Sequence, residues 1–254
     1  LLILGAGLGL GRLLSHGLGL RPFLNRPERW LLSFGLGLPA LSGVTLLLGR
    51  SGLLTSDRAR LLLGGLWIVS LIVVRPGRSS APIVSDPDAS PSPLPRLGSA
   101  GWWLFLGLAL PFVVTMMLAS MLPTIDYDSL EYHLQGPKEY FQAGQVRFLP
   151  HNVYTSMPFS VEMLHYLGML VLNDWWRGAL VGQWLVALHA PMAALCIALV
   201  AGRWSSPRAA WIAALVYLTT PWIFRMAAIP YVEGPLCFYH AALIWAAARS
   251  WDLD

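Results

Sequence analysis

The stretch GWWLFLGLALPFVVTMMLASML, residues 101–122, decides the fold class, because it is free of charged side chains over a length that crosses a bilayer. Further apolar runs cover residues 1–20, 31–49, 59–74, 178–201, 208–224 and 233–248. Of the 254 residues, 56% are hydrophobic and only 12% are charged, which is too little charge to cover a soluble protein of this size. We therefore predict an all-α, polytopic bundle of transmembrane helices.

Composition also divides the chain along its length. Residues 1–74 form a first hydrophobic group, and residues 75–100 form a linker in which prolines alternate with Ser and Asp. Residues 101–254 hold the remaining spans and one long polar loop. Because the chain starts inside an apolar run, we expect a fragment of a longer protein.

Arginine placement predicts the topology, since cytoplasmic loops are enriched in Lys and Arg. The linker carries Arg75, Arg78 and Arg96, and the short loop near residue 203 carries Arg203. The polar loop, residues 123–177, has few cations for its length, so we expect it on the outer face. Arg50, Arg58 and Arg60 would also lie outside, against this bias.

The polar loop holds six of the thirteen acidic residues, together with three histidines. Asp128, Glu131, Tyr132 and Gln135 have the spacing of one α-helical face. Gly136-Pro137 should then break or kink the helix, and Gly144 should end it. The pattern predicts a short helix with an acidic face at the membrane surface. The alternative is structural, since Asp128 and Glu131 have the spacing of a capping box.

Two further groups of residues are candidates for chemistry. Glu233 lies at the outer start of the last apolar run, where it either serves function or begins a helix that Pro235 follows. Four residues of the loop could hold a divalent metal, namely His133, His151, His165 and Glu162. The sequence assigns none of them as a metal ligand with certainty. No sequence motif for a nucleophilic serine or a nucleotide-binding loop occurs.

Several segments within residues 101–254 form a recognisable series: Pro123-Thr-Ile-Asp126-Tyr-Asp128-Ser-Leu-Glu-Tyr132-His-Leu, Gly136-Pro-Lys-Glu-Tyr-Phe-Gln-Ala-Gly144, Pro150-His-Asn-Val-Tyr154, Pro158 and Glu162-Met-Leu-His-Tyr166. Together these segments resemble the GT-C superfamily of integral-membrane glycosyltransferases, which includes protein O-mannosyltransferases and the aminoarabinose lipid A transferase. The chain departs from the family where the first motif often reads Asp-Glu and here reads Asp128-Ser129.

The resemblance implies a multi-pass protein of the bacterial inner (plasma) membrane that moves a sugar from a polyprenyl-phosphate donor to an acceptor hydroxyl on a lipid, glycan or protein. It implies that Asp128 is the catalytic base, that Asp126 is the neighbouring alternative and that Glu233 lines the same site. We expect further residues to bind the substrates: Glu131, Tyr132, Lys138 and Arg225.

Other functions are weighed against this one. Nucleic acid is excluded as a partner, because the cations are scattered and form no basic stripe, whereas membrane lipids are expected partners. A transporter or flippase would carry polar residues at mid-membrane on interrupted helices. A non-catalytic membrane scaffold would use Asp128 and Glu233 only to cap helices.

Overall fold

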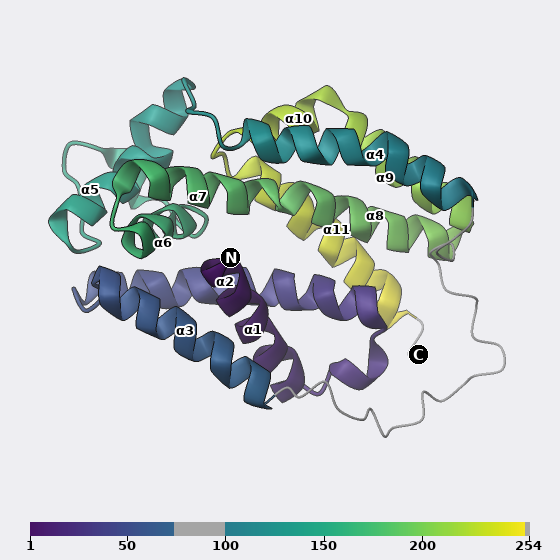
Figure 1. Ribbon diagram of the computed structural model, residues 1–254, viewed down its shortest axis with the longest axis horizontal. Helices are drawn as coiled ribbons and strands as arrows, with labels where there is room; N and C mark the ends of the chain where they lie inside the picture. The colour runs from purple at the N-terminus through teal and green to yellow at the C-terminus, as the bar shows by residue number, and fades with distance from the viewer. Residues whose placement is uncertain (74–99, 252–254) are drawn as a thin grey trace. The chain divides into compact units, whose positions relative to one another are not determined.

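The computed structural model describes residues 1–73 and 100–251, and every regular element within these ranges is helical (Figure 1). The predicted all-α class is confirmed for them. The predicted linker, apart from Ala100, lies outside the described residues. In chain order the elements are α1 (Leu2–Gly17), η1 (Arg21–Phe23), α2 (Arg26–Arg50), α3 (Ser56–Val73), α4 (Ala100–Ala119), η2 (Ser129–His133), α5 (Gln135–Ala143), η3 (Val153–Ser156), α6 (Glu162–Leu172), α7 (Trp175–Ala187), α8 (His189–Trp204), α9 (Pro207–Thr219), α10 (Pro221–Ala228) and α11 (Glu233–Ser250).

Among the described residues, three helical stretches are long and apolar enough to cross a membrane: Arg26–Arg50, Gly101–Ala119 and Trp175–Trp204. A fourth is counted if the pair α9 and α10, bent by 61°, is one broken span. The three stretches match the predicted runs 31–49, 101–122 and 178–201, whereas the predicted run 208–224 is broken between α9 and α10. The runs 1–20, 59–74 and 233–248 also form helices, but these do not reach the combined length and hydropathy of a span.

Packing divides the described residues into two units. One contains residues 1–73 and 125–182, and the other contains residues 100–124 and 183–251. The polar loop therefore packs with the N-terminal helices, although it follows the linker in sequence. The division of the sequence at residues 75–100 describes order along the chain and stays a prediction.

Glycines let the first two helices of the first unit approach backbone to backbone. A Cβ atom on Gly37 of α2 would overlap the carbonyl oxygen of Gly7 on α1, and one on Gly11 would overlap the carbonyl oxygen of Ser33. Such small-residue crossings are typical of helices that associate within lipid. α2 itself begins with a capping box, in which Asn25 Oδ1 accepts from Glu28 N and Glu28 Oε2 accepts from Asn25 N.

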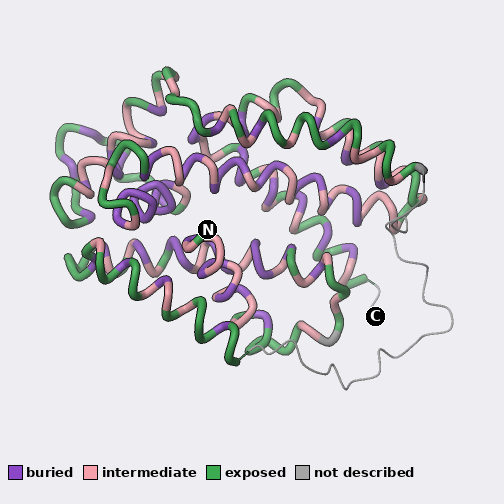
Figure 2. The backbone as a smooth tube through the Cα atoms, in the orientation of Figure 1, coloured by how far each residue is buried: buried purple, intermediate pink, exposed green. Residues whose placement is uncertain are grey.

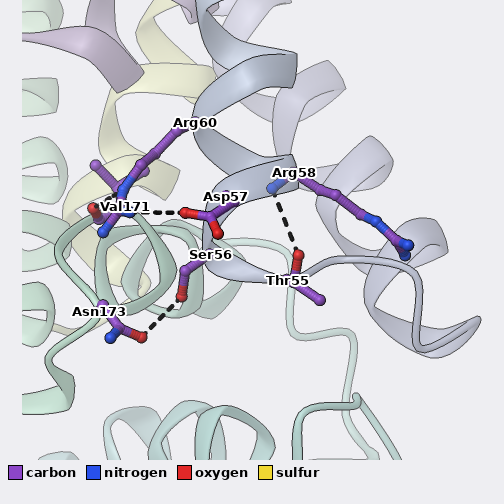
Figure 3. Close-up of polar contacts among 7 residues, drawn as sticks. All are labelled: Thr55, Ser56, Asp57, Arg58, Arg60, Val171 and Asn173. Carbon is purple, nitrogen blue, oxygen red and sulfur yellow. Dashed lines mark hydrogen bonds and ion pairs between the residues drawn. The ribbon is translucent and has the colours of Figure 1, made fainter.

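Polar contacts join the start of α3 to the end of α6 (Figure 3). Arg60 Nε donates to the carbonyl oxygen of Val171 at 2.8 Å, and Arg60 also pairs with Asp57 at 3.0 Å. Ser56 Oγ lies 2.9 Å from Asn173 Oδ1. A cation at a helix C-terminus interacts favourably with the last carbonyl groups. Arg60 therefore has a local structural use, which accounts for a cation that ran against the predicted topology.

The second unit packs through small side chains. Ala109 of α4 lies in one buried cluster with alanines of α8 and α9, and Leu218 completes it. Only 11% of the apolar stretch of α4 is nevertheless buried, so most of this helix is exposed or half-buried along the tube in Figure 2. An exposed helix without charged side chains is typical of a span that faces lipid.

Candidate functional site

The polar loop begins with a π-helical turn, where the spacing had predicted an α-helix. η2, residues Ser129–His133, is closed by a hydrogen bond from Leu134 N to Ser129 O at 2.9 Å. Pro137 contributes to this change of pitch, because its nitrogen has no proton for the carbonyl group four residues earlier. π-turns inside helices are rare and are frequently found at functional sites.

The π-turn alters the face on which the predicted residues lie. The grouping of Asp128, Glu131, Tyr132 and Gln135 assumed α-helical spacing throughout, and the π-turn does not keep that spacing. The predicted end of the helix is confirmed, because α5 stops at Gly144 in a left-handed conformation with φ of 67°.

His133 and Glu162 form a buried pair that holds the π-turn against α6. The distance from His133 Nδ1 to Glu162 Oε1 is 2.7 Å, and the two side chains are only 4% and 2% exposed. With the carboxylate as acceptor, Nδ1 carries the proton. Buried polar groups cost free energy unless they are paired, so this contact fixes one position of the π-turn on α6.

Two more contacts hold the π-turn from the side of η3. Asn152 Nδ2 donates to the carbonyl oxygen of Glu131 at 2.7 Å. The ring of Tyr132 stacks on that of Tyr154, with 5.1 Å between centroids. The backbone that follows Asp128 is thus held by the buried pair, an amide and an aromatic stack. This gives the carboxylates at the start of the loop a defined place.

Asp128 is not used as a helix cap. Its own backbone is helical (φ −62°, ψ −33°), and its side chain makes no capping hydrogen bond. The capping-box alternative is therefore wrong for this residue. Asp126 and Asp128 are both half-buried, and Asp126 O accepts from Leu130 N at 3.1 Å. The half-buried carboxylate of Asp128 therefore stays a candidate for chemistry.

The other predicted residues of the loop lie close by in the same unit. Lys138 places its ammonium group 4.1 Å from the centre of the Trp175 ring, a cation–π contact. Glu131 and Tyr132 are half-buried in and beside the π-turn. The π-turn and the first turns of α5 therefore bring a carboxylate, a phenol and an ammonium group onto one short segment.

Glu233 and Arg225 belong to the second unit. Glu233 is exposed and lies in the first turn of α11, with Pro235 behind it, so it begins a helix as one reading of the sequence predicted. Arg225 is exposed in the last turn of α10. Their proposed roles with Asp128 stay predictions.

Of the four predicted metal ligands, the structure brings together only His133 and Glu162. His165 lies on α6 but turns its Nδ1 to the carbonyl oxygen of Ala179 at 3.2 Å, and His151 pairs instead with Glu139 at 2.9 Å. Within residues 1–73 and 100–251, no three His, Cys, Asp or Glu side chains are placed to hold a metal ion. Glu162 and His165 share α6, as their i, i+3 spacing predicted, but each contacts a different partner.

The π-turn and the segments packed on it leave several buried polar atoms without a protein partner. They are Ser129 Oγ, Asn152 Oδ1, Glu162 Oε2, His165 Nε2 and Tyr166 Oη. Burial also raises the pKa of Tyr166 to about 12, so its hydroxyl keeps its proton at neutral pH. The interior of this part of the protein is consequently unusually polar.

His165 should make stability depend on pH. Burial lowers its pKa to about 4, although the Ala179 carbonyl acts in the opposite direction. The folded protein then binds fewer protons than the unfolded chain below pH 6.5. Above about pH 6.5 His165 is neutral in both states and does not lower the free energy of unfolding. As the pH falls towards 4, the unfolded chain takes up this proton first, and the free energy of unfolding falls by about 3 kcal/mol. Thermal unfolding of the detergent-solubilised protein across this range measures the loss.

The variant His165→Asn tests the assignment, because its amide nitrogen can still donate to Ala179 while it cannot be protonated. We expect its stability to fall less between pH 6.5 and 4 than that of the wild type. His151→Asn changes an exposed histidine and is the matched control. An equal pH dependence in His165→Asn and the wild type would contradict the assignment.

Sequence reasoning missed the His133–Glu162 pair and the role of Asn152. The sequence grouped both residues as candidate metal ligands but did not pair them, since 29 residues separate them and no spacing rule connects them. The sequence offered one weaker signal: a charged residue, Glu162, is the first residue of the largely apolar helix α6.

Comparison with known proteins leaves this geometry as the main guide to function. No protein-family model, no curated protein and no solved structure matches the chain.

Proposed function

We propose that the chain is the membrane-embedded part of a GT-C-type glycosyltransferase, a multi-pass protein of the bacterial inner membrane. It moves a sugar from a polyprenyl-phosphate donor to an acceptor hydroxyl on a lipid, glycan or protein at the outer face. The observation that carries the proposal is a half-buried Asp128 that caps no helix and precedes a π-turn held by the buried His133–Glu162 pair. The apolar helical stretches support the membrane setting.

In this mechanism Asp128 accepts the proton of the acceptor hydroxyl as its oxygen attacks the anomeric carbon of the donor. The bond from that carbon to the phosphate oxygen breaks, and the polyprenyl phosphate leaves with the electron pair. The carboxylate of Asp126 stabilises the positive charge that develops on the sugar. A single displacement inverts the anomeric configuration.

The leaving phosphate needs positive charge nearby, and Lys138 supplies it in this proposal. The contact of Lys138 with the Trp175 ring supports its part, since the ring restrains a flexible side chain while the ammonium keeps its charge. Tyr132, stacked on Tyr154, and Glu131 would contact the sugar or the acceptor.

A second candidate function is a carrier for a lipid-linked sugar. The observation that favours it is the 61° bend between α9 and α10, because transporters often bind substrate at broken helices. Against it, no acidic residue lies on either helix, and the acids of the chain cluster in the polar loop. The scaffold alternative loses support because Asp128 does not cap a helix.

Replacement of Asp128 with Asn tests the proposal. Full-length protein in proteoliposomes is given radiolabelled polyprenyl-phosphate mannose or aminoarabinose, and sugar transfer is counted. Loss of the base should lower transfer by about 10²-fold or more, with thermal stability unchanged.

Asp57→Asn is the matched control, because Asp57 is an exposed carboxylate on α3. Unchanged transfer by Asp128→Asn would contradict the base assignment. Movement of labelled donor across the bilayer with its sugar–phosphate bond intact would favour the carrier.

A further inference from the structure

Polarity is inverted in the part of the loop around the π-turn. Four polar residues are buried there, namely Ser129, His133, Asn152 and Glu162, whereas large apolar side chains nearby are exposed. Leu130 is 56% exposed, Val153 70% and Met157 46%. A water-solvated loop normally shows the reverse pattern, because exposed apolar surface is unfavourable in water.

The exposed apolar side chains belong to segments that are bound to one another. The Asn152–Glu131 hydrogen bond joins the start of η3 to the residue after Leu130, and the stacked Tyr132 and Tyr154 rings join the same two segments. Met157 N donates to Tyr154 O at 3.2 Å, which keeps it on the same turn. We call Leu130, Val153, Tyr154 and Met157 the apolar patch.

Chain connectivity limits what can cover the apolar patch. The exposed Ile125 and Tyr127 precede it, and α4, a candidate span, ends only six residues before Ile125. Because a residue extends the chain by at most about 3.5 Å, Ile125 stays within about 20 Å of the end of that span. The loop leads at its other end into the candidate span that starts at Trp175.

The contact between Lys138 and Trp175 points to the same surroundings. Tryptophan is enriched at the membrane–water boundary, and lysine there extends its ammonium group towards water while its stem stays in apolar surroundings. Trp175 begins a candidate span, and Lys138 lies above its ring within the same unit as the apolar patch.

We propose that the apolar patch inserts into the boundary between headgroups and acyl chains of the bilayer, as interfacial elements do. The inference rests on the membrane setting of the proposed function but not on sugar transfer. It follows that the carboxylates of Asp126 and Asp128 lie at the level of the lipid headgroups. The head group of a lipid-linked substrate lies at the same level. The partner of this surface is lipid.

Site-directed fluorescence tests the insertion. Cys196 and Cys237 are replaced by Ala, and Val153→Cys or Met157→Cys is labelled with an NBD fluorophore. The full-length protein is placed, one molecule per disc, in phosphatidylcholine nanodiscs that contain nitroxide lipids. We expect blue-shifted emission, strong quenching by a nitroxide near the top of the acyl chain, and weak quenching by aqueous iodide.

The matched control is Gln142→Cys, an exposed position on the polar side of α5 in the same unit. Its label should be quenched several-fold more by iodide than the labels of the apolar patch. Equal iodide quenching at Val153, Met157 and Gln142 would overturn the proposal. If the labels at Val153 and Met157 were protected from iodide only in discs that hold two protein molecules, the proposal would also be overturned. The partner of the apolar patch would then be a second copy of the protein. Because no sugar transfer is measured, failure here is distinct from failure of the Asp128→Asn test.

Discussion

Replacing Gly37 with alanine is expected to destabilise the first unit by about 3 kcal/mol or more, because the new methyl group would overlap backbone atoms of α1. The overlap is with the carbonyl oxygen of Gly7 and the amide nitrogen of Gly11, so no side chain can rotate to relieve it. The two helices would have to separate, with loss of the packing on both sides of the crossing. The effect is measured by heating purified protein in detergent and determining, by size-exclusion chromatography, how much folded protein remains at each temperature.

Gly43→Ala is a matched control on the same helix. A Cβ atom at Gly43 meets no atom within 4 Å, so the substitution should be neutral or stabilise α2 by up to about 1 kcal/mol through helix propensity. Equal stability of Gly37→Ala and Gly43→Ala would show that α1 and α2 do not cross at these glycines.

Replacing Glu162 with alanine is the second large effect that we expect. It removes the carboxylate that His133 contacts in the interior and should cost about 3–5 kcal/mol, as for other buried pairs that lose one partner. The double variant His133→Phe with Glu162→Leu removes both polar groups and should recover much of that loss, because an apolar replacement of a buried pair is often neutral. Thermal unfolding of the single and double variants measures this coupling.

The pair of His151 and Glu139 offers a control with the same residue types. His151 is 64% exposed, so Glu139→Ala should cost no more than about 1 kcal/mol. If Glu162→Ala were as mild as Glu139→Ala, or if the double variant were less stable than Glu162→Ala alone, His133 and Glu162 would not act as a buried pair.

The local course of the polar loop was only partly predictable. Gly144 ends α5 as expected, because only a residue without a side chain adopts its left-handed conformation easily. A cap at Asp128 was the structural alternative, because its spacing from Glu131 fits a capping box, but that rule assumes that the helix starts after Asp128 with α-helical hydrogen bonds. The π-turn breaks that assumption.

The metal interpretation shows a similar limit. Glu162 and His165 do share α6, as the sequence indicated, yet they contact different partners. Spacing fixes which residues lie near one another on a single helix. It does not fix which neighbouring segment each side chain meets.

By itself the sequence determined the helical class and the position of the strongest apolar helices, such as residues 101–122, because lipid-compatible runs are a local property of composition. Only the tertiary structure decided that His133 pairs with Glu162, that Asp128 is not a cap and that apolar side chains of the loop face outward. The physical reason is that burial depends on segments far apart in the chain. A carboxylate or imidazole has no preferred partner until packing excludes water and makes an unpaired polar group costly.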